Sequence, residues 1–505
     1  MKNTFFALSL GCSLMMIDFV EAKTSSTEAP VVKPKSIPSK MGTAKLSKVK
    51  TYPKLKADSM TTEHPFMQAL IQAYTSNPEL KAKVKEQNAL AEELPKAYAG
   101  WRPSINGTAM AAYNKGTNQI EKITSSSHPK TAGLEVRQNV FEGGKTLANT
   151  TYAENLILAG NASFTAIEQS ILLKAIQAYL DLWARRQELE INRTSVRFFE
   201  FSLEQAKARA DVGEIGLTEI AEAEFSYSGA LADFISAEAE VQNATATYIK
   251  VIGHQPPKEL VLPSDIAERV TLPSSLEELK KLSTDGNPTL QQAVFDAKSA
   301  EAGIDIATAD LMPKVDVVGD AGRQLNSRRR TRTHEIAARV EVKIPIYQGG
   351  SEWASIRASH QTAAQKAIGV RTVRRQVIEN AIQVWETRYA SKGRIKRLET
   401  QIKAGETRIE GTRQESLVGE RTFLDVLYAQ KDVVNARIGF VRATSDFLSS
   451  GYQILGAMGN LSAALLKLPV QKHNVNGYAE EVSGHYIGWG DVPSREEIRD
   501  AAGTD

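Results

Sequence analysis

Alternation of apolar and charged residues identifies the clearest strand in this chain. Between 335 and 347 the even-numbered positions are apolar and most odd-numbered positions are charged or polar. The apolar positions are Ile336, Ala338, Val340, Val342, Ile344 and Ile346. A period of two puts successive side chains on opposite faces, so one face of this strand is apolar and the other is charged. A weaker alternation over 134–140 predicts a second such strand, and segments 104–113 and 314–323 are expected to face these two.

Two long segments without proline predict unusually long helices. No proline occurs from 146 to 210 or from 352 to 416. Within both segments large apolar residues recur at steps of four, three and four, the spacing of a coiled-coil seam. The seam residues are Leu172, Ile176, Tyr179 and Trp183 in the first helix and Ile378, Ile382, Trp385 and Tyr389 in the second. At about 1.5 Å per residue each helix reaches roughly 100 Å. We interpret the aromatic residues as helix-packing groups rather than as a ligand cage.

These elements occur twice, because the chain contains an internal repeat. Motifs near the start of the two copies are separated by an offset of 210 residues, and later motifs by an offset of 206. The matched motifs are Asn77-Pro78-Glu79-Leu80 with Asn287-Pro288-Thr289-Leu290, Val140-Phe141-Glu142-Gly143-Gly144 with Ile346-Tyr347-Gln348-Gly349-Gly350, and Val212-Gly213-Glu214 with Val418-Gly419-Glu420. The change of four residues falls between Pro103 and Val140, so a loop in that region differs in length between the copies.

Prolines and glycines divide each copy into helix, strand, strand, long helix, turn and return helix. First helices are expected over 79–100 and 288–310, and Pro95 should kink the former. Return helices are expected over 217–252 and 423–458. Pairs of glycines supply the bend from strand to long helix: Gly143 and Gly144 in the first copy, Gly349 and Gly350 in the second. Gly213 and Gly419 supply the left-handed turn that ends each long helix.

The two ends of the chain differ in character from the repeated body. Lys2, an apolar run over 5–17 and the small-residue site around Ala22 predict a secretory signal. A lipoprotein signal, with Cys12 as the lipidated residue, is the alternative. The next segment carries nine lysines against two acids, which fits a flexible basic arm or an arm that binds anionic lipid or cell-wall polymer. The predicted organisation is a signal peptide (1–22), a basic linker (23–62), the first copy (63–253), a connecting segment (254–285), the second copy (286–468) and a polar, irregular tail (469–505).

Composition excludes several classes of protein. Of the 505 residues 42% are hydrophobic and 24% are charged, with 18 prolines. Such a chain is neither collagenous nor wholly disordered. With one cysteine, it has no internal disulfide. The body beyond the basic arm is not basic, so we expect no nucleic-acid partner. Beyond residue 22 there is no run of about 18 consecutive apolar residues, so no membrane-spanning helix is expected.

Catalytic and cofactor sites are not indicated either, and we expect no enzyme activity, metal or cofactor. Gly143-Gly144-Lys145-Thr146 follows a strand and opens a helix like a phosphate loop, but Asn139 stands where that motif needs its first glycine. The glycine pair is better explained as the strand-to-helix bend. The seven histidines include no pair at metal-ligand spacing, and no Gly-x-Ser-x-Gly elbow occurs.

The predicted elements require an elongated, oligomeric protein. A helix of about 100 Å exceeds the dimensions of a compact domain of this size. Four strands with one apolar and one charged face leave unsatisfied edges in lipid, so several chains must pool their strands in a closed barrel. Strands of about ten residues are long enough to cross a membrane in such a barrel. The charged face would then line a wet lumen; a soluble sheet with one solvated face is the alternative.

The order of these motifs, duplicated in register, resembles the TolC family of outer-membrane channels over roughly 63–468. The resemblance implies a mainly α fold with a four-stranded transmembrane β contribution. It further implies a homotrimer with a twelve-stranded barrel in outer-membrane lipid and a periplasmic tunnel of helices. Members of the family act as exit ducts for drug efflux and type I protein secretion in Gram-negative bacteria. Their partners are a periplasmic adaptor, or membrane fusion, protein and an inner-membrane RND or ABC transporter.

The resemblance also places functional residues at the end of the helices farthest from the membrane. Arg421 is then a gating residue with Glu219 as its expected partner, and Asp425 lines an acidic ring that favours cations. Tyr428 stands one turn later, where the family often has a second acid, which weakens that filter. An ordinary solvated ion pair is the alternative for Arg421 and Glu219. The adaptor-docking tip comprises Val212, Gly213, Glu214, Val418, Gly419 and Glu420.

Two functional classes remain from the sequence. The first is a passive, gated outer-membrane duct, and the second is a structural periplasmic coiled-coil protein without a pore. The strand pair at 335–347 separates them, since only the duct needs that pair in lipid. Within the first class the sequence does not separate small-molecule efflux from polypeptide secretion, because cargo choice lies with the partners.

Overall fold

The computed structural model describes residues 64–118, 120, 123–325, 332–471, 473–474, 476–488 and 492–502. The chain divides into two units, 1–54 and 55–505, and all described residues belong to the second unit. The predicted signal peptide with Cys12 and the basic linker therefore lie outside the described residues. The same holds for residues 326–331.

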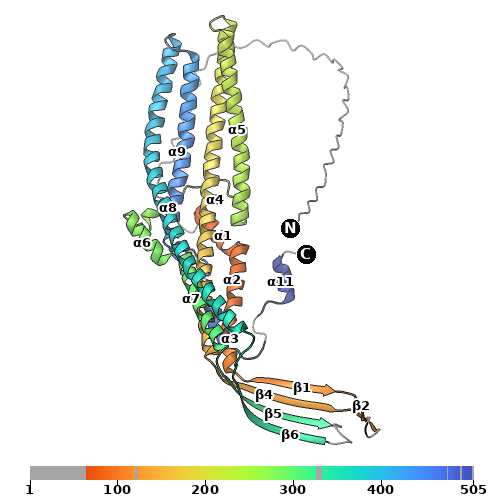
Figure 1. The fold of residues 1–505 in the computed structure, drawn as a ribbon. Helices are drawn as coiled ribbons and strands as arrows, with labels where there is room; N and C mark the ends of the chain where they lie inside the picture. The colour runs from red at the N-terminus through yellow and green to blue at the C-terminus, as the bar shows by residue number, and fades with distance from the viewer. Residues whose placement is uncertain are drawn as a thin grey trace, which may run out of the picture. The chain divides into compact units, whose positions relative to one another are not determined.

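Both copies of the repeat contain the predicted order of elements (Figure 1). The first copy comprises α1 (Pro65–Ser76), α2 (Pro78–Ala91), α3 (Glu93–Tyr98), η1 (Ala99–Trp101), β1 (Ser104–Ala111), β4 (Lys130–Glu142), α4 (Lys145–Asp211) and α5 (Leu217–Ile252). The second comprises α6 (Leu276–Gly286), α7 (Pro288–Ala309), β5 (Lys314–Leu325), β6 (Arg332–Lys343), α8 (Ser351–Leu417) and α9 (Phe423–Ala457). The long helices α4 and α8 have 67 residues each. At a rise of about 1.5 Å per residue, each extends over about 100 Å.

Local sequence explains where the first helices begin and break. The side chains of Asn77 and Asn287 accept hydrogen bonds from the first-turn N–H groups of α2 and α7, and a proline follows each asparagine at the first helical position. The helix is interrupted just before Pro95, where a kink was expected: α2 ends at Ala91 and α3 begins at Glu93.

Four features differ from the sequence-based expectations. Helices α1 and α6, which precede the two Asn-Pro motifs, were not predicted. The longer loop of the first copy carries a small hairpin of β2 (Asn114–Asn118) and β3 (Ile123–Ser127). The connecting segment contains η2 (Ile266–Glu268) in addition to α6. The tail, expected to be irregular, forms α10 (Gly477–Ser483) and α11 (Arg495–Ala502).

The tail is ordered around α10 because it docks on the first copy. The hydroxyl of Tyr478 donates to Glu92 (2.8 Å), and the amide of Asn161 donates to Asn476 (2.7 Å). The Arg102 guanidinium donates to the carbonyl of His485 (3.0 Å) and lies 4.0 Å from the ring centroid of Tyr486.

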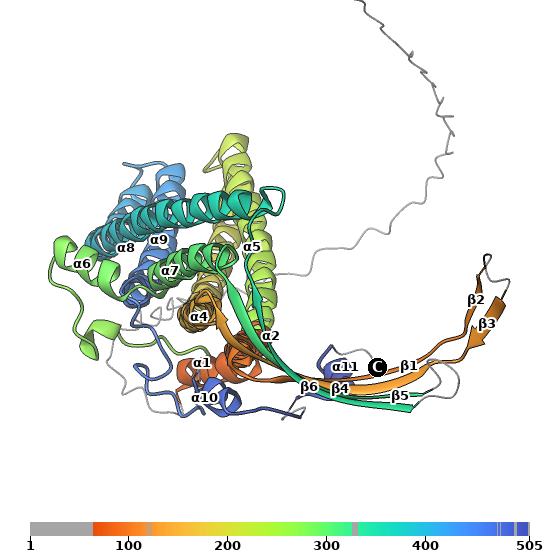
Figure 2. The same ribbon diagram turned by 60° about the horizontal axis from the view of Figure 1, so that its bottom comes forward.

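The main sheet joins the two copies at its centre (Figure 2). Its strand order is β1-β4-β5-β6, and every neighbouring pair is antiparallel. The inner pairing, β4 with β5, connects the first copy to the second, with a bulge between Asn139 and Phe141. Strands β1 and β6 form the two edges and have no partner strand on their outer sides in the described part of the chain.

The predicted two-faced character of the sheet is present. Apolar side chains gather on one face and are exposed: Ile105, Leu134, Val136, Val317, Ile336, Val340 and Val342. Charged side chains occupy the other face: Glu135, Arg137, Asp316, Asp320, Arg339 and Glu341. An exposed apolar face opposite a charged face is the arrangement of a strand group that faces lipid on one side and water on the other.

Helix α4 lies at the centre of the helical part, against α5, α7 and α9 and against the short helices α1 to α3. In its middle turns Leu172, Ile176 and Tyr179 are fully buried, and the Tyr179 hydroxyl donates to the carbonyl of Val261 (2.9 Å). This helix also contains a stretch apolar enough to cross a membrane by length and composition. Since much of α4 is buried among other helices, we attribute that stretch to the protein core.

The seam expected in both long helices is buried in the first and only partly buried in the second. Trp183 of α4 is 6% exposed, whereas its counterpart Tyr389 of α8 is 75% exposed. Helix α8 instead buries the positions one residue earlier, including Val377, Ala381 and Val384. In the second copy Ile378, Ile382 and Trp385 are half-buried and Tyr389 is exposed, because α8 packs against α6, α7 and α9 but lies outside the centre occupied by α4.

Candidate functional site

The two hairpin tips, where α4 turns into α5 and α8 into α9, have the same backbone. Gly213 and Gly419 both have φ of 80°. Residues other than glycine rarely adopt this positive φ. In each tip the N–H of the residue after the glycine closes the turn: Glu214 donates to the carbonyl of Arg209 (2.9 Å), and Glu420 donates to that of Glu415 (2.9 Å). The predicted tip residues Val212 and Val418 are 71% and 73% exposed. Both tips therefore present defined, exposed turns.

The charges on the two tips are arranged differently. In the first copy the Arg209 guanidinium pairs with Glu214 across the turn at 3.0 Å. In the second copy the helix end carries the acid Glu415, and Arg421 after the turn pairs with it at 3.3 Å. Each pair closes its own hairpin.

Arg421 thus pairs with Glu415, and not with the expected partner Glu219. Glu415 lies only six residues earlier in the chain, so the turn itself brings it to Arg421. Glu219 lies on α5 and lines the same pocket, a cavity of about 470 Å³ between the two tips that also includes Arg209, Phe423 and Asp425. One carboxylate oxygen of Glu219, Oε2, is buried without a hydrogen-bond partner among the described residues. Arg421 and Glu219 therefore line one pocket without an ion pair between them.

Asp425 is fixed by a capping box at the start of α9. The Thr422 hydroxyl (2.8 Å) and backbone N–H (3.1 Å) both donate to its carboxylate. These bonds, together with the charges of Arg421 and Arg408, lower the pKa of Asp425. Asp425 is accordingly a fixed negative charge beside the pocket. Tyr428 lies one turn later and is 52% exposed.

The strand-to-helix bends are built on the predicted glycine pairs. Gly143, Gly144, Gly349 and Gly350 all have positive φ, and Gly144 and Gly350 form the N-caps of α4 and α8. A Cβ on Gly143 would collide with the side chain of Met312, so this position also needs glycine for close packing.

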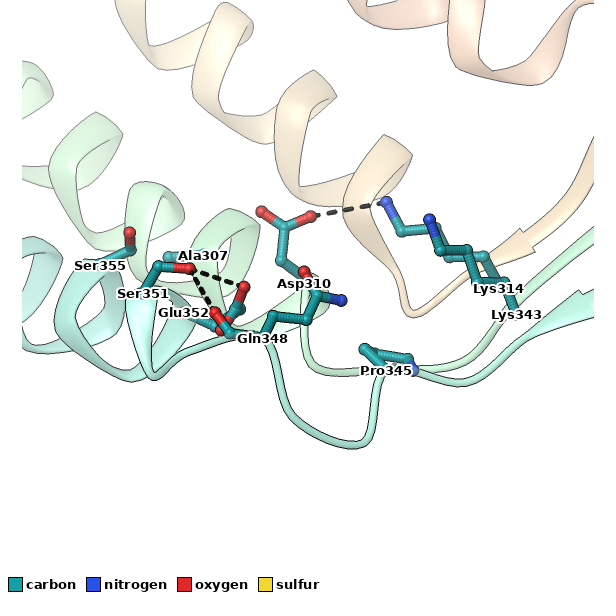
Figure 3. Close-up of a pocket in the computed structure, with 9 residues that line it drawn as sticks. All are labelled: Ala307, Asp310, Lys314, Lys343, Pro345, Gln348, Ser351, Glu352 and Ser355. Carbon is teal, nitrogen blue, oxygen red and sulfur yellow. Dashed lines mark hydrogen bonds and ion pairs between the residues drawn. The ribbon is translucent and has the colours of Figure 1, made fainter.

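Beside the second bend lies a polar cavity of about 340 Å³ (Figure 3). Its lining includes Asp310, which pairs with Lys145 at 2.8 Å, and Lys314, which pairs with Glu142 at 2.7 Å. Because Lys145 and Glu142 belong to the first copy and Asp310 and Lys314 to the second, these pairs join the copies where helices and sheet meet.

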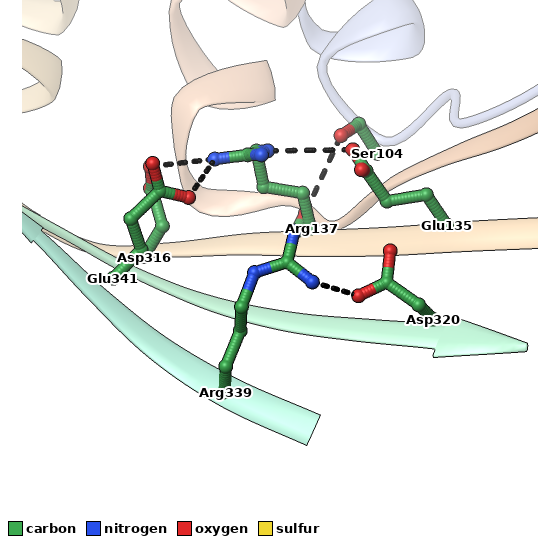
Figure 4. A network of polar contacts seen from close by, with 7 residues as sticks. All are labelled: Ser104, Glu135, Arg137, Asp316, Asp320, Arg339 and Glu341. Carbon is green, nitrogen blue, oxygen red and sulfur yellow. Dashed lines mark hydrogen bonds and ion pairs between the residues drawn. The ribbon is translucent and has the colours of Figure 1, made fainter. Parts of the chain in front are cut away.

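The charged face of the sheet carries an ion-pair network that crosses three strands (Figure 4). Arg137 on β4 bonds Asp316 on β5 (3.2 Å) and Glu341 on β6 (3.1 Å). Arg339 on β6 pairs with Asp320 on β5. Val318, between the two arginines in register, is fully buried beneath this network.

Sequence reasoning missed three of these groups. Thr422 was visible as the first residue of a Thr-x-x-Asp capping box. Glu415 could have been found from its spacing to Arg421. The partners of Arg137 lie 179 and 204 residues away, and only the strand register brings them together.

Comparisons with known proteins agree with this architecture. The family model for the outer membrane efflux protein matches residues 69–254 and 280–460, one segment for each copy. The chain is similar to the outer membrane efflux protein BepC of Brucella suis, with 29% identity over 423 residues that cover 83% of this chain and 91% of BepC. It is 24% identical to the outer membrane protein TolC of Vibrio cholerae, covering 77% of this chain and 90% of that protein.

Solved structures show the same fold. The outer membrane channel CmeC of Campylobacter jejuni aligns with a TM-score of 0.71 at 14% identity, covering 86% of this chain and 94% of CmeC. CusC aligns with a TM-score of 0.70 at 14% identity, covering 78% of this chain and 92% of CusC. The matched proteins are named as channels and efflux or secretion components, not enzymes, so the comparisons favour the duct over a rod without a pore. This chain belongs to the outer membrane efflux protein family, and it is an exit duct of a Gram-negative outer membrane with a long periplasmic helical part.

Proposed function

We propose that three copies of this chain close into one gated duct whose tips dock a periplasmic adaptor. The main support is that β1 and α5 of the first copy and β6 and α8 of the second leave open the surfaces whose repeat counterparts are covered within the chain. The duct then receives its cargo from an inner-membrane RND or ABC transporter through that adaptor.

The sheet supports closure through its edges. Within the chain, β4 of the first copy pairs with β5 of the second. By the repeat, β6 corresponds to β4 and β1 to β5, so β6 of one chain is expected to pair with β1 of the next. Exposed strand edges are not tolerated in lipid, and closure removes both edges. Three chains give twelve strands, within the range of outer-membrane barrels.

The helices support the same closure. Ala184 on α4 and Val441 on α9 are buried in one apolar cluster that joins the two copies. Their counterparts in the repeat are Ala390 on α8 and Ile235 on α5. Both counterparts are exposed in the single chain, Ile235 by 58%. A neighbouring chain that brings its α5 against α8 would bury them as α9 buries Ala184.

The tips supply the gate in this proposal. Arg421 holds the second hairpin closed through Glu415, and Glu219 offers it an acceptor across the pocket. Three Asp425 carboxylates around the aperture favour cations. Opening exchanges these contacts for others, and an adaptor that occupies the exposed turns around Gly213 and Gly419 would promote that exchange.

Single-channel conductance in planar bilayers tests the gate. Arg421→Ser removes the Glu415 pair, and we expect severalfold higher conductance with unchanged helix content. The matched control is Arg193→Ser, which removes an exposed pair (Arg193 with Glu190, 3.3 Å) from the shaft of α4 and should leave conductance unchanged. Equal conductance in Arg421→Ser and the wild-type protein would contradict the gating role.

A further inference from the structure

The apolar face of the sheet changes character towards the hairpin ends that lie farthest from the helices (Figure 1). Register places Val342, Val340, Ala338 and Ile336 along this face of β6, followed by His334 and Arg332. On β5 the corresponding series runs from Val317 through Ala321 to Arg323. On β4 it runs from Val136 and Leu134 through Ala132 to Lys130.

The charged members of this face are all basic and lie close together. Lys130 and Arg332 occupy one register row, with Leu325 between them, and Arg323 and His334 occupy the next row on this face. Neighbouring strands are about 4.8 Å apart, so the row from Lys130 to Arg332 is roughly 10 Å wide. All four basic side chains are exposed.

No acid accompanies this cluster. On the apolar face of β1, β4, β5 and β6, the described positions include no aspartate or glutamate. Within the described part of the chain, none of the four basic side chains makes an ion pair. The acids of these strands lie on the opposite face, where they pair with Arg137 and Arg339.

The membrane position of the cluster follows from the fold. The helices are periplasmic, so the hairpin ends lie at the outer surface of the outer membrane. The apolar band from Val342 to Ile336 spans about 20 Å at roughly 3.4 Å per residue and faces lipid. A cation on the lipid-facing side is tolerated at the interface and strongly disfavoured at the midplane, which places Lys130, Arg323 and Arg332 at headgroup level.

We propose that Lys130, Arg323 and Arg332, with His334, form a binding surface for phosphorylated lipid headgroups of the outer leaflet. Continuity with the lipid-facing band selects a lipid as the occupant. The unpaired positive charge selects a phosphate-bearing headgroup, which arginine binds through two parallel hydrogen bonds. The proposal rests on the outer-membrane location of the sheet and does not depend on the gate at the tips.

Thermal stability with defined lipids tests this surface. The probes are bisphosphorylated lipid A and its enzymatically dephosphorylated form, each added to the full-length protein in a neutral detergent. We expect lipid A to raise the Tm and the dephosphorylated form to have little effect. The variant K130Q/R323Q/R332Q should lose most of that rise while keeping the wild-type Tm in detergent alone.

Matched controls test whether this surface binds the phosphates of a lipid. Arg339→Gln removes a charge from the opposite face of β6 and should keep the full response to lipid A. Equal Tm rises with both lipid forms, or an unchanged response in the triple variant, would overturn the proposal. So would an equal rise with inorganic phosphate alone, because that result would indicate a site for free anions. If the triple variant does not fold, Arg332→Gln alone should still reduce the amount of lipid A that native mass spectrometry detects on the protein.

Discussion

The two copies of the repeat share one secondary structure but differ in what they bury. Helices α4 and α8 have the same length and begin at equivalent glycines. Helix α4 buries side chains on several faces, whereas α8 buries side chains on one face. Tyr389 of α8, the counterpart of the buried Trp183 of α4, is exposed. The first copy is completed within the chain by α7 and α9. The second copy has no equivalent cover among the described residues, and in the proposed trimer a neighbouring chain supplies it.

The two tips differ in their capping as well as in their charges. Asp425 is held by Thr422, which caps α9 through its side chain. The equivalent acid, Glu219, follows Gly216, which has no side chain to cap α5. The two copies therefore share the same turn but differ in how the acid after the turn is hydrogen-bonded. One acid is fixed by hydrogen bonds, and the other has an unsatisfied oxygen beside the pocket between the tips.

The largest expected difference between the copies concerns their seam residues. Trp183→Ala removes a buried side chain, and we expect it to destabilise the chain by about 3–5 kcal/mol. Tyr389→Ala, the equivalent change in α8, removes an exposed side chain and should have little effect on an isolated chain. Denaturant unfolding of monomers, followed by circular dichroism, measures both. Tyr389→Ala should instead lower the temperature at which assembled chains dissociate. Equal losses of monomer stability in Trp183→Ala and Tyr389→Ala would contradict the claim that only the first of these side chains is buried in the single chain.

A smaller effect is expected from the cap on Asp425, and it depends on pH. Since Thr422 lowers the pKa of Asp425 by stabilising the carboxylate, the capping contribution is complete above the usual aspartate pKa of about 3.9 and is lost as the pH falls through the lowered value. Cation selectivity, measured as a reversal potential in a salt gradient, should therefore persist to about pH 4.

Removing the hydroxyl should move that transition. Thr422→Val takes away one of the two Thr422 donors to the carboxylate, so the pKa of Asp425 rises and selectivity declines at a higher pH than in the wild-type protein. The control Thr407→Val removes a hydroxyl that bonds to the backbone of α8, at Lys403, and should leave the pH profile in place. The same profile for both variants would show that Asp425 does not set the selectivity.

The smallest effect is expected from giving the first copy the cap of the second. Gly216 has extended backbone angles, and a Cβ there meets no atom within 4 Å, so Gly216→Thr should be tolerated. A threonine at this position would complete a Thr-x-x-Glu capping box with Glu219 and stabilise α5 by roughly a few tenths of a kcal/mol. Thermal unfolding compared with Gly216→Ala isolates the hydroxyl. A loss of stability specific to threonine would exclude the proposed cap.

The sequence predicted the repeated elements well because their signals are local. The alternation over 335–347 and the proline-free stretch after Thr146 depend on neighbouring residues. The long helix α4 formed as expected, and the strand formed as β6, which ends at Lys343, before Pro345. Helix α1 was missed because it is a short helix before a proline, without a long periodic pattern. The exposure of Tyr389 could not be read from spacing, since the same spacing is buried in α4; its environment depends on which helices surround α8.

The candidate site was less predictable than the fold. The motif around Gly419 located the tip, and the spacing of Glu415 and Arg421 across the turn could have indicated their pair; the distance from Arg421 to Glu219 depends on the separation of two hairpins, which no local pattern encodes. The network of Arg137 depends on strand register across both copies. The roles of Glu219, Arg421 and Asp425 in gating remain predictions, and the conductance and selectivity experiments test them.

Cross-linking between neighbouring chains tests whether three copies of this chain close into one duct. Ala390→Cys in the second copy and Ile235→Cys in the first place thiols at the repeat counterparts of the buried pair Ala184 and Val441. In outer membranes treated with a short bismaleimide, the double variant should give covalent dimers and trimers and no larger species, while each single variant stays monomeric on a denaturing gel. Absence of cross-links, or a ladder that continues beyond three chains, would contradict a closed three-chain duct.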